Sequence, residues 1–185
     1  MWKPFAVMLV VLCALGALVA PGTAGAVSFE SRDFDALSRE ADQVVIGTMV
    51  ATNARRTGER EIVTDYRFNN LEVVKGTVAG SSLTLTMLGG TVGNDSLTVA
   101  GAPTFKRGTR YLVFVSGNGS VMFPLVGGTQ GIFQMRKDAA SGVTKVHDYV
   151  GRPVKQLPGL GRRTSEDVVR DDALESITQA EFVEA

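Results

Sequence analysis

The sequence predicts a mainly β protein: a small closed β-barrel of about five to six strands, with a short helix before it and an amphipathic helix at the C-terminus. Short stretches rich in β-branched and aromatic residues recur between turn residues. One long stretch, 62–73, changes the parity of its apolar positions near Asn69-Asn70, as a β-bulge would cause. A bulged long strand and Gly-rich turns favour a closed barrel, with a β-sandwich as the alternative.

The N-terminal helix is expected over residues 31–41. Ser31 or Asp33 can cap it. Its apolar positions share one face at helical spacing, and they are Phe34, Leu37 and Ala41.

The strand pattern recurs at 43–50, 62–73, 83–87, 110–115, 121–126 and 132–135, and more weakly near 143–150. Residues 43–50 are almost continuously apolar, which predicts a strand buried on both faces. Residues 53–60 are expected to form a polar loop, and Gly117-Asn118-Gly119 a hairpin turn. Pro124 indicates that 121–126 returns as an edge strand.

The C-terminal part, 152–185, is predicted to be a linker followed by a helix that starts at Thr164. The apolar stripe of that helix consists of Val169, Ala173, Leu174 and Ile177. Such a stripe usually packs on its own domain, and binding of a partner is the alternative.

The N-terminus has the features of a secretory signal peptide. Lys3 precedes an apolar run over 5–20, and Ala24-Gly25-Ala26 supplies a cleavage site before Val27. We therefore expect a signal peptide over 1–26, a barrel domain with its helix over 27–151, and an exported chain, periplasmic or extracellular, with no stable membrane anchor.

Cleavage would remove the only Cys, Cys13, and the only Trp, Trp2. It would also remove Lys3, which leaves 18 of the 19 basic residues against 19 acidic ones, a net charge of −1. That balance argues against nucleic acid as a partner. His147 is the only histidine, and Asp148 beside it would point to the opposite face of a strand. We expect no catalytic residue, no metal site and no cofactor.

Two Gly-rich segments are candidate binding loops. The first contains Gly89, Gly90, Asn94 and Asp95, and it is either a binding loop or a long hairpin connection. The second contains Gly128, Thr129, Gln130 and Gly131. Its glycines suit either the close approach of a ligand or a tight corner of the barrel.

An ordered set of motifs resembles an uncharacterised family of exported bacterial proteins. The set begins with Ala41-Asp42-Gln43-Val44-Val45-Ile46-Gly47-Thr48 and continues through 64–68, 72–76, 89–90, 105–108, 111–114 and 128–133. In layout that family resembles the netrin-like, OB-type barrels that include tissue inhibitors of metalloproteinases. Those inhibitors place a mature N-terminal Cys on the zinc of the protease, whereas this chain would begin at Val27 and retain no Cys.

The expected function is that of a non-catalytic, exported module that binds a protein partner. A first alternative, which the resemblance implies, is a metalloprotease inhibitor or protease-associated factor that acts through the amine of Val27. A second alternative is a structural or assembly component of the cell envelope.

Overall fold

The computed structural model describes residues 32–155 and 176–184. The predicted signal peptide, its cleavage site before Val27 and most of the helix predicted from Thr164 therefore lie outside the described residues. The described chain is mainly β, as predicted. Its main sheet is antiparallel and has six strands in the order β3-β2-β1-β6-β7-β8, and β4 and β5 form a separate pair.

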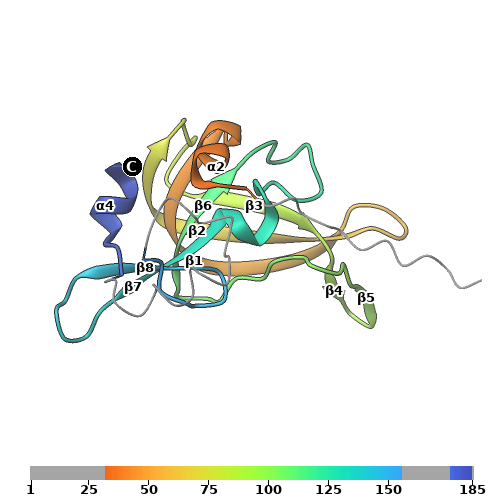
Figure 1. The fold of residues 1–185 in the computed structure, drawn as a ribbon. Coiled ribbons are helices and arrows are strands. Elements are labelled where there is room, and N and C mark those ends of the chain that lie inside the picture. The colour runs from red at the N-terminus through yellow and green to blue at the C-terminus, as the bar shows by residue number, and fades with distance from the viewer. Residues whose placement is uncertain (1–31, 156–175, 185) are drawn as a thin grey trace, which may run out of the picture.

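The elements are shown in Figure 1. The strands of the main sheet are β1 (Gln43–Arg56), β2 (Ile62–Lys75), β3 (Leu83–Leu88), β6 (Arg110–Val115), β7 (Ile132–Lys137) and β8 (Thr144–His147). The small hairpin consists of β4 (Gly90–Val92) and β5 (Asp95–Leu97). The helices are α2 (Phe34–Glu40), the 3-10 helix η2 (Gly128–Gly131) and α4 (Gln179–Glu184). No helix in the described part of the chain is long and apolar enough to cross a bilayer.

Helix α2 confirms the predicted N-terminal helix. The side chain of Asp33 accepts a hydrogen bond from the Ala36 N–H at 2.7 Å, and this bond caps the first turn. Leu37 on the apolar face is fully buried. The helix ends at Glu40, where the chain extends into β1.

The predicted bulge in β2 is present. Ile46 pairs with Glu72 and Thr48 pairs with Asn69, so β2 uses one residue more than β1 over this interval. Asn70 lies inside it with φ of 53°. The polar loop predicted at 53–60 is wrong in its first half, because β1 continues as a strand to Arg56 along the β1–β2 ladder.

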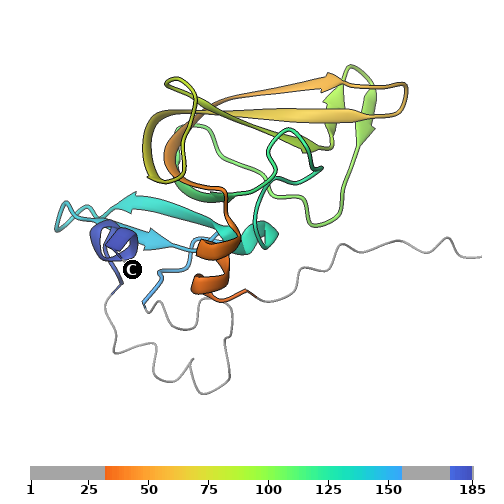
Figure 2. The same ribbon diagram turned by 90° about the horizontal axis from the view of Figure 1, so that it is seen from above.

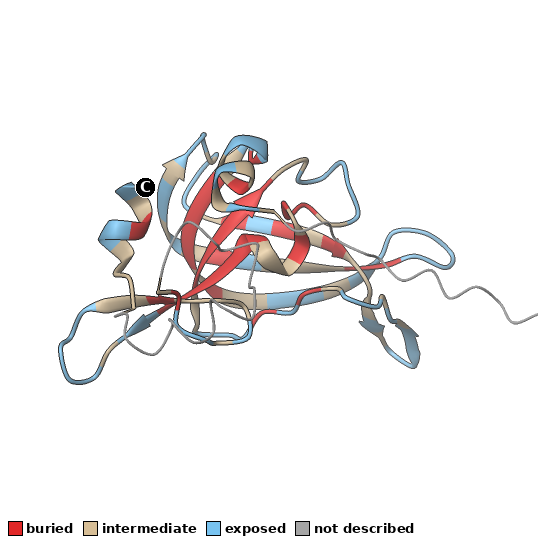
Figure 3. Cartoon of the chain, viewed as in Figure 1, coloured by how far each residue is buried: buried red, intermediate tan, exposed pale blue. Residues whose placement is uncertain are grey.

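The sheet has a hydrophobic core on each face, so the first half of β1 and all of β6 lie between two cores, as predicted for residues 43–50 (Figure 3). The first core, beneath α2 and α4, contains Leu37, Ala41, Val44, Ile46, Leu112, Phe114, Val126, Phe133, Met135, Val146, Val154 and Phe182. The second core contains Val45, Met49, Phe68, Leu83, Leu85, Met87, Phe105, Tyr111, Val113, Val115, Leu125 and Ile132.

The prediction of a closed barrel is wrong for the described strands, which form a coiled, open sheet with β3 and β8 at its two ends (Figure 2). The strand predicted at 121–126 does not form; within it only Leu125 makes a β-bridge, to Val115. Pro124 has no N–H for a ladder. β6 pairs with β7, and residues 117–123 leave the sheet as a loop that returns at 124–126, where the Val126 N–H donates to the Phe114 carbonyl at 3.0 Å.

The C-terminal segment covers the outer edge of β8. The Val146 N–H donates to the Ile177 carbonyl at 3.1 Å, and the Val154 N–H donates to the Val146 carbonyl at 2.9 Å. In α4, Phe182 is buried against Phe133, with ring centroids 4.9 Å apart. The described part of this segment therefore packs on its own domain, and Ile177 of the predicted stripe packs against the first core just before α4.

Candidate functional site

The first Gly-rich segment docks on the sheet. The Gly89 N–H donates to the Ile62 carbonyl at 2.8 Å, and the Gly89 carbonyl accepts from the Thr64 hydroxyl at 2.7 Å. A Cβ on Gly90 would collide with that hydroxyl. The close approach of protein atoms therefore explains Gly90, and a φ of 107° explains Gly89.

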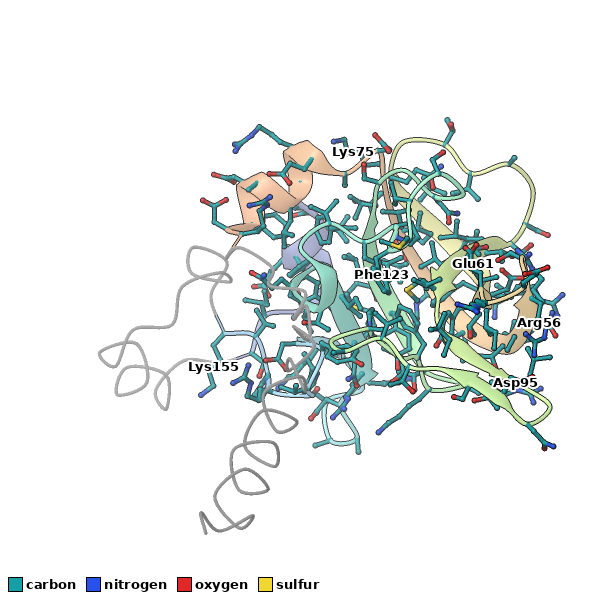
Figure 4. The ribbon with its side chains drawn as sticks, turned by 90° about the vertical axis from the view of Figure 1, so that its right-hand side faces the viewer. Arg56, Glu61, Lys75, Asp95, Phe123 and Lys155 are labelled. Atoms are coloured by element: carbon teal, nitrogen blue, oxygen red, sulfur yellow. The ribbon has the colours of Figure 1, made fainter. Side chains whose placement is uncertain are left out.

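Asn94 and Asp95 lie at the tip of the β4–β5 hairpin, and both are exposed. Asp95 forms an ion pair with Arg56 at the end of β1. Figure 4 shows this pair at the outer end of the molecule. An exposed pair of this kind contributes little to stability, so the hairpin tip is a solvated projection.

The second Gly-rich segment is a tight corner. Gly127 has φ of 63° and Gly128 has φ of 62°, a left-handed conformation that favours glycine. A Cβ on Gly131 would collide with the Val126 carbonyl oxygen. The side of Gly131 where a side chain would project is thus occupied by the backbone of Val126 and is not open to a ligand. Of the two interpretations left open by the sequence, the geometry of this glycine favours the corner.

The two predicted loops lie in different parts of the molecule, because η2 is next to α2 and the β4–β5 hairpin is beside the far end of β1 and β2 (Figures 1 and 2). The corner does meet the start of the described chain. The Arg32 N–H donates to Oε1 of Gln130 at 2.9 Å. The first described residue, Arg32, is therefore held beside Gln130.

His147 is a partly buried strand residue. It pairs with Gln134 of β7, and its Nδ1 is buried without a hydrogen-bond partner among the described residues. Burial lowers the pKa of His147, and the positive charge of Arg136 lowers it further. The described residues contain no cluster of three or more His, Cys, Asp or Glu side chains that could hold a metal ion.

A surface that sequence reasoning missed lies where residues 117–123 face β3. We call this line of contact the β3 seam. The Leu88 N–H donates to the Met122 carbonyl at 3.0 Å, and Nδ2 of Asn118 donates to the Thr84 carbonyl at 2.8 Å. The loop therefore touches the edge of β3 at two points, one near each end of the strand.

Asp42 holds the start of this loop. Its Oδ2 accepts from the Gly117 N–H at 2.9 Å and from the Ser116 hydroxyl at 3.0 Å. The hydrogen bond from Gly117 has the largest effect and lowers the pKa of the Asp42 carboxyl. The hydrogen bond from Ser116 and the positive charge of Lys75 lower this pKa further. Asp42 is therefore an exposed, ionised carboxylate at one end of the seam.

An open groove of about 370 Å³ lies at that end of the seam. It is lined by Asp42, Gln43, Val78, Ala79, Ser82, Leu83, Thr84, Val115, Gly117 and Asn118. Among the described residues, Asp42 is the one charged side chain in this lining. The described part of the groove is thus a mixed polar and apolar depression with the negative charge of Asp42.

Apolar side chains on the loop reach solvent beside the seam. Val121 is 49% exposed and Met122 is 62% exposed. The next residue, Phe123, is partly buried and packs against the second core; Figure 4 shows it turned toward the sheet. A loop with a buried anchor and an exposed apolar tip is suited to contact with another protein.

The signal for this surface was present in the sequence but was interpreted as a strand. Residues 121–126 are apolar, and Gly117-Asn118-Gly119 resembles a hairpin turn. An apolar run explains a buried strand and an exposed loop tip equally well until the partner strand is known.

Comparison of the chain with protein-family models, with curated proteins and with solved structures finds no match.

Proposed function

We propose that this chain is an exported, non-catalytic module that binds a protein partner. The observation that carries the proposal is the exposed apolar pair Val121 and Met122 on a loop anchored by Phe123, beside the open groove. Exposed apolar side chains next to a shaped depression are typical of protein interfaces. Export rests on the signal-peptide pattern before Val27.

The test is affinity capture from the exported protein fraction of the source organism, with the chain from Val27 as bait. Met122→Asp places a charge in the proposed interface, and Val150→Asp, at a residue that is 67% exposed, is the matched control. A specific partner should be captured at least about tenfold less by Met122→Asp and unchanged by Val150→Asp. Equal capture by both variants, or no specific capture by the unaltered chain, would refute the proposal.

The finer fold assignment is also a proposal. The coiled sheet, the bulge in β2 and the flanking helices support a relation to netrin-like, OB-type barrels. Closure is not part of this proposal, since the described strands form an open sheet.

A second candidate function is inhibition of a metalloprotease through the amine of Val27. The contact between the Arg32 N–H and Gln130 favours it, because it holds Arg32, a residue close in sequence to Val27, on the domain. Inhibition should be lost when residues are added before Val27 and kept when they are added after Ala185. Equal inhibition by the two extended chains would exclude a role for the amine.

A further inference from the structure

The edge of β3 carries unpaired backbone groups. In the β2–β3 ladder, the Gly89 N–H donates to Ile62, so Leu88, Thr86 and Thr84 direct their N–H and C=O groups away from β2. The Leu88 N–H and the Thr84 carbonyl are taken by the loop. The N–H groups of Thr84 and Thr86, together with the Thr86 carbonyl, have no hydrogen-bond partner within the described ranges.

This edge is a template for an extended chain. A strand that presents free N–H and C=O groups at a two-residue period pairs with another extended backbone. The two loop contacts to β3 use one side-chain amide and one carbonyl, so an incoming strand could replace both with equivalent hydrogen bonds. Such a strand would displace these two loop contacts from the edge of β3.

The negative charge of Asp42 favours a positively charged occupant of the groove. Oδ2 of Asp42 accepts both of the hydrogen bonds of this carboxylate, which leaves Oδ1 without a partner in the described part of the chain. A Lys or Arg side chain in the groove would supply the complementary charge. The apolar neighbours Leu83, Val115 and Val78 would contact the aliphatic stem of such a side chain.

We propose that β3 and the adjoining groove bind an extended, basic-residue-containing segment of a partner polypeptide by strand addition, with the basic side chain at Asp42. This proposal rests on the proposed function, since it specifies the partner's chemistry at the same surface. The exposed Val121 and Met122 would then flank the added strand.

The probe is a displayed library of random linear peptides, selected against the chain from Val27. Thr86→Pro removes the outward N–H without removing a hydrogen bond of the β2–β3 ladder. Thr86→Val is the matched control, because it keeps the N–H and loses the same hydroxyl contact to Asp65. Selected peptides should contain Lys or Arg and should bind Thr86→Pro at least about tenfold more weakly than Thr86→Val.

Asp42→Asn tests the charge, with Asp35→Asn on the exposed first turn of α2 as control. The selected peptides should bind Asp42→Asn about threefold more weakly and Asp35→Asn unchanged. Selection of no peptide, equal binding by both Thr86 variants, or no effect of Asp42→Asn would overturn the proposal. A self-association that Thr86→Pro abolishes would also overturn it, because the occupant would then be a second copy of the chain.

The two proposals fail in different ways. If capture of a partner depends on Met122 but no peptide is selected, the chain is a protein-binding module that does not use strand addition. If neither experiment gives a specific partner, both proposals are wrong.

Discussion

At the scale of single residues, close backbone approaches decide where glycine is required. Gly131 has a φ outside the left-handed region, so its need for glycine comes from contact alone. The Val126 carbonyl oxygen occupies the space of a Cβ, and Phe114 Cβ would lie 3.3 Å away. The corner that joins the loop to β7 depends on this missing side chain.

Gly131→Ala should therefore destabilise the fold by about 2 kcal/mol, because a methyl group must displace backbone. Gly58→Ala is the control, since the nearest atom to a Cβ there is Glu61 Cβ at 3.7 Å, an ordinary contact. Urea unfolding followed by circular dichroism measures both variants. Equal stability of the two would contradict this account of the corner.

His147 gives the molecule a pH dependence. Its pKa is lowered in the folded state by burial and by the charge of Arg136; the backbone of Lys145 and the charge of Asp148 oppose this shift, and the charge of Lys145 adds to it. The unfolded chain therefore binds a proton at higher pH than the folded chain does. The free energy of unfolding should fall as the pH drops through about 6.5, and this loss is complete below the folded-state pKa.

The measurement is the midpoint of urea unfolding at a series of pH values, with His147→Gln as reference. The free energy of unfolding of the unaltered chain should fall relative to that of His147→Gln as the pH drops through about 6.5. A constant difference would show that the histidine titrates alike in both states.

At the scale of elements, α4 is held by aromatic packing. Phe182 contacts Phe34 and Phe133, with ring centroids 5.0 and 4.9 Å away. Phe182→Ala should cost about 3 kcal/mol through lost burial and the cavity that remains. Glu184→Ala, at an exposed position of the same helix, should change stability by less than about 0.5 kcal/mol. Thermal or urea unfolding tests both, and a neutral Phe182→Ala would mean that α4 does not support the first core.

The β1–β2 pair shows why element boundaries were only partly predictable. The alternation of apolar and polar residues located the bulge at Asn69-Asn70, because an extra residue in a strand moves the following apolar residues from odd to even positions or the reverse. It missed the end of β1, because residues 53–56 are mostly polar and show no alternation of large apolar side chains. Their strand conformation comes from pairing with β2, including the ion pair between Arg55 and Asp65 at 2.8 Å.

At the scale of the whole molecule, two cores share one sheet. Strands β1 and β6 contribute side chains to both, so loss of one core should also destabilise the strands on which the other core is built. All three tyrosines, Tyr66, Tyr111 and Tyr149, belong to or pack against the second core. Tyrosine fluorescence therefore reports on the second core alone, while circular dichroism reports on the whole sheet.

Phe182→Ala alters only the first core, yet it should shift the tyrosine-fluorescence transition by the same amount as the circular-dichroism transition. The chain from Val27 suits this measurement because it has no Trp. Separate midpoints for the two signals would show that the cores unfold independently.

The sequence by itself determined what depends on neighbours along the chain: the cap at Asp33, the strand interiors, the doubly buried start of β1 and the bulge in β2. It also located the two Gly-rich segments and left their roles open. Only the tertiary structure decided which edges meet. A β-ladder joins residues distant in sequence, and local patterns do not encode the partner. For that reason the open edge of β3, its loop cover and the groove at Asp42 became visible only in three dimensions.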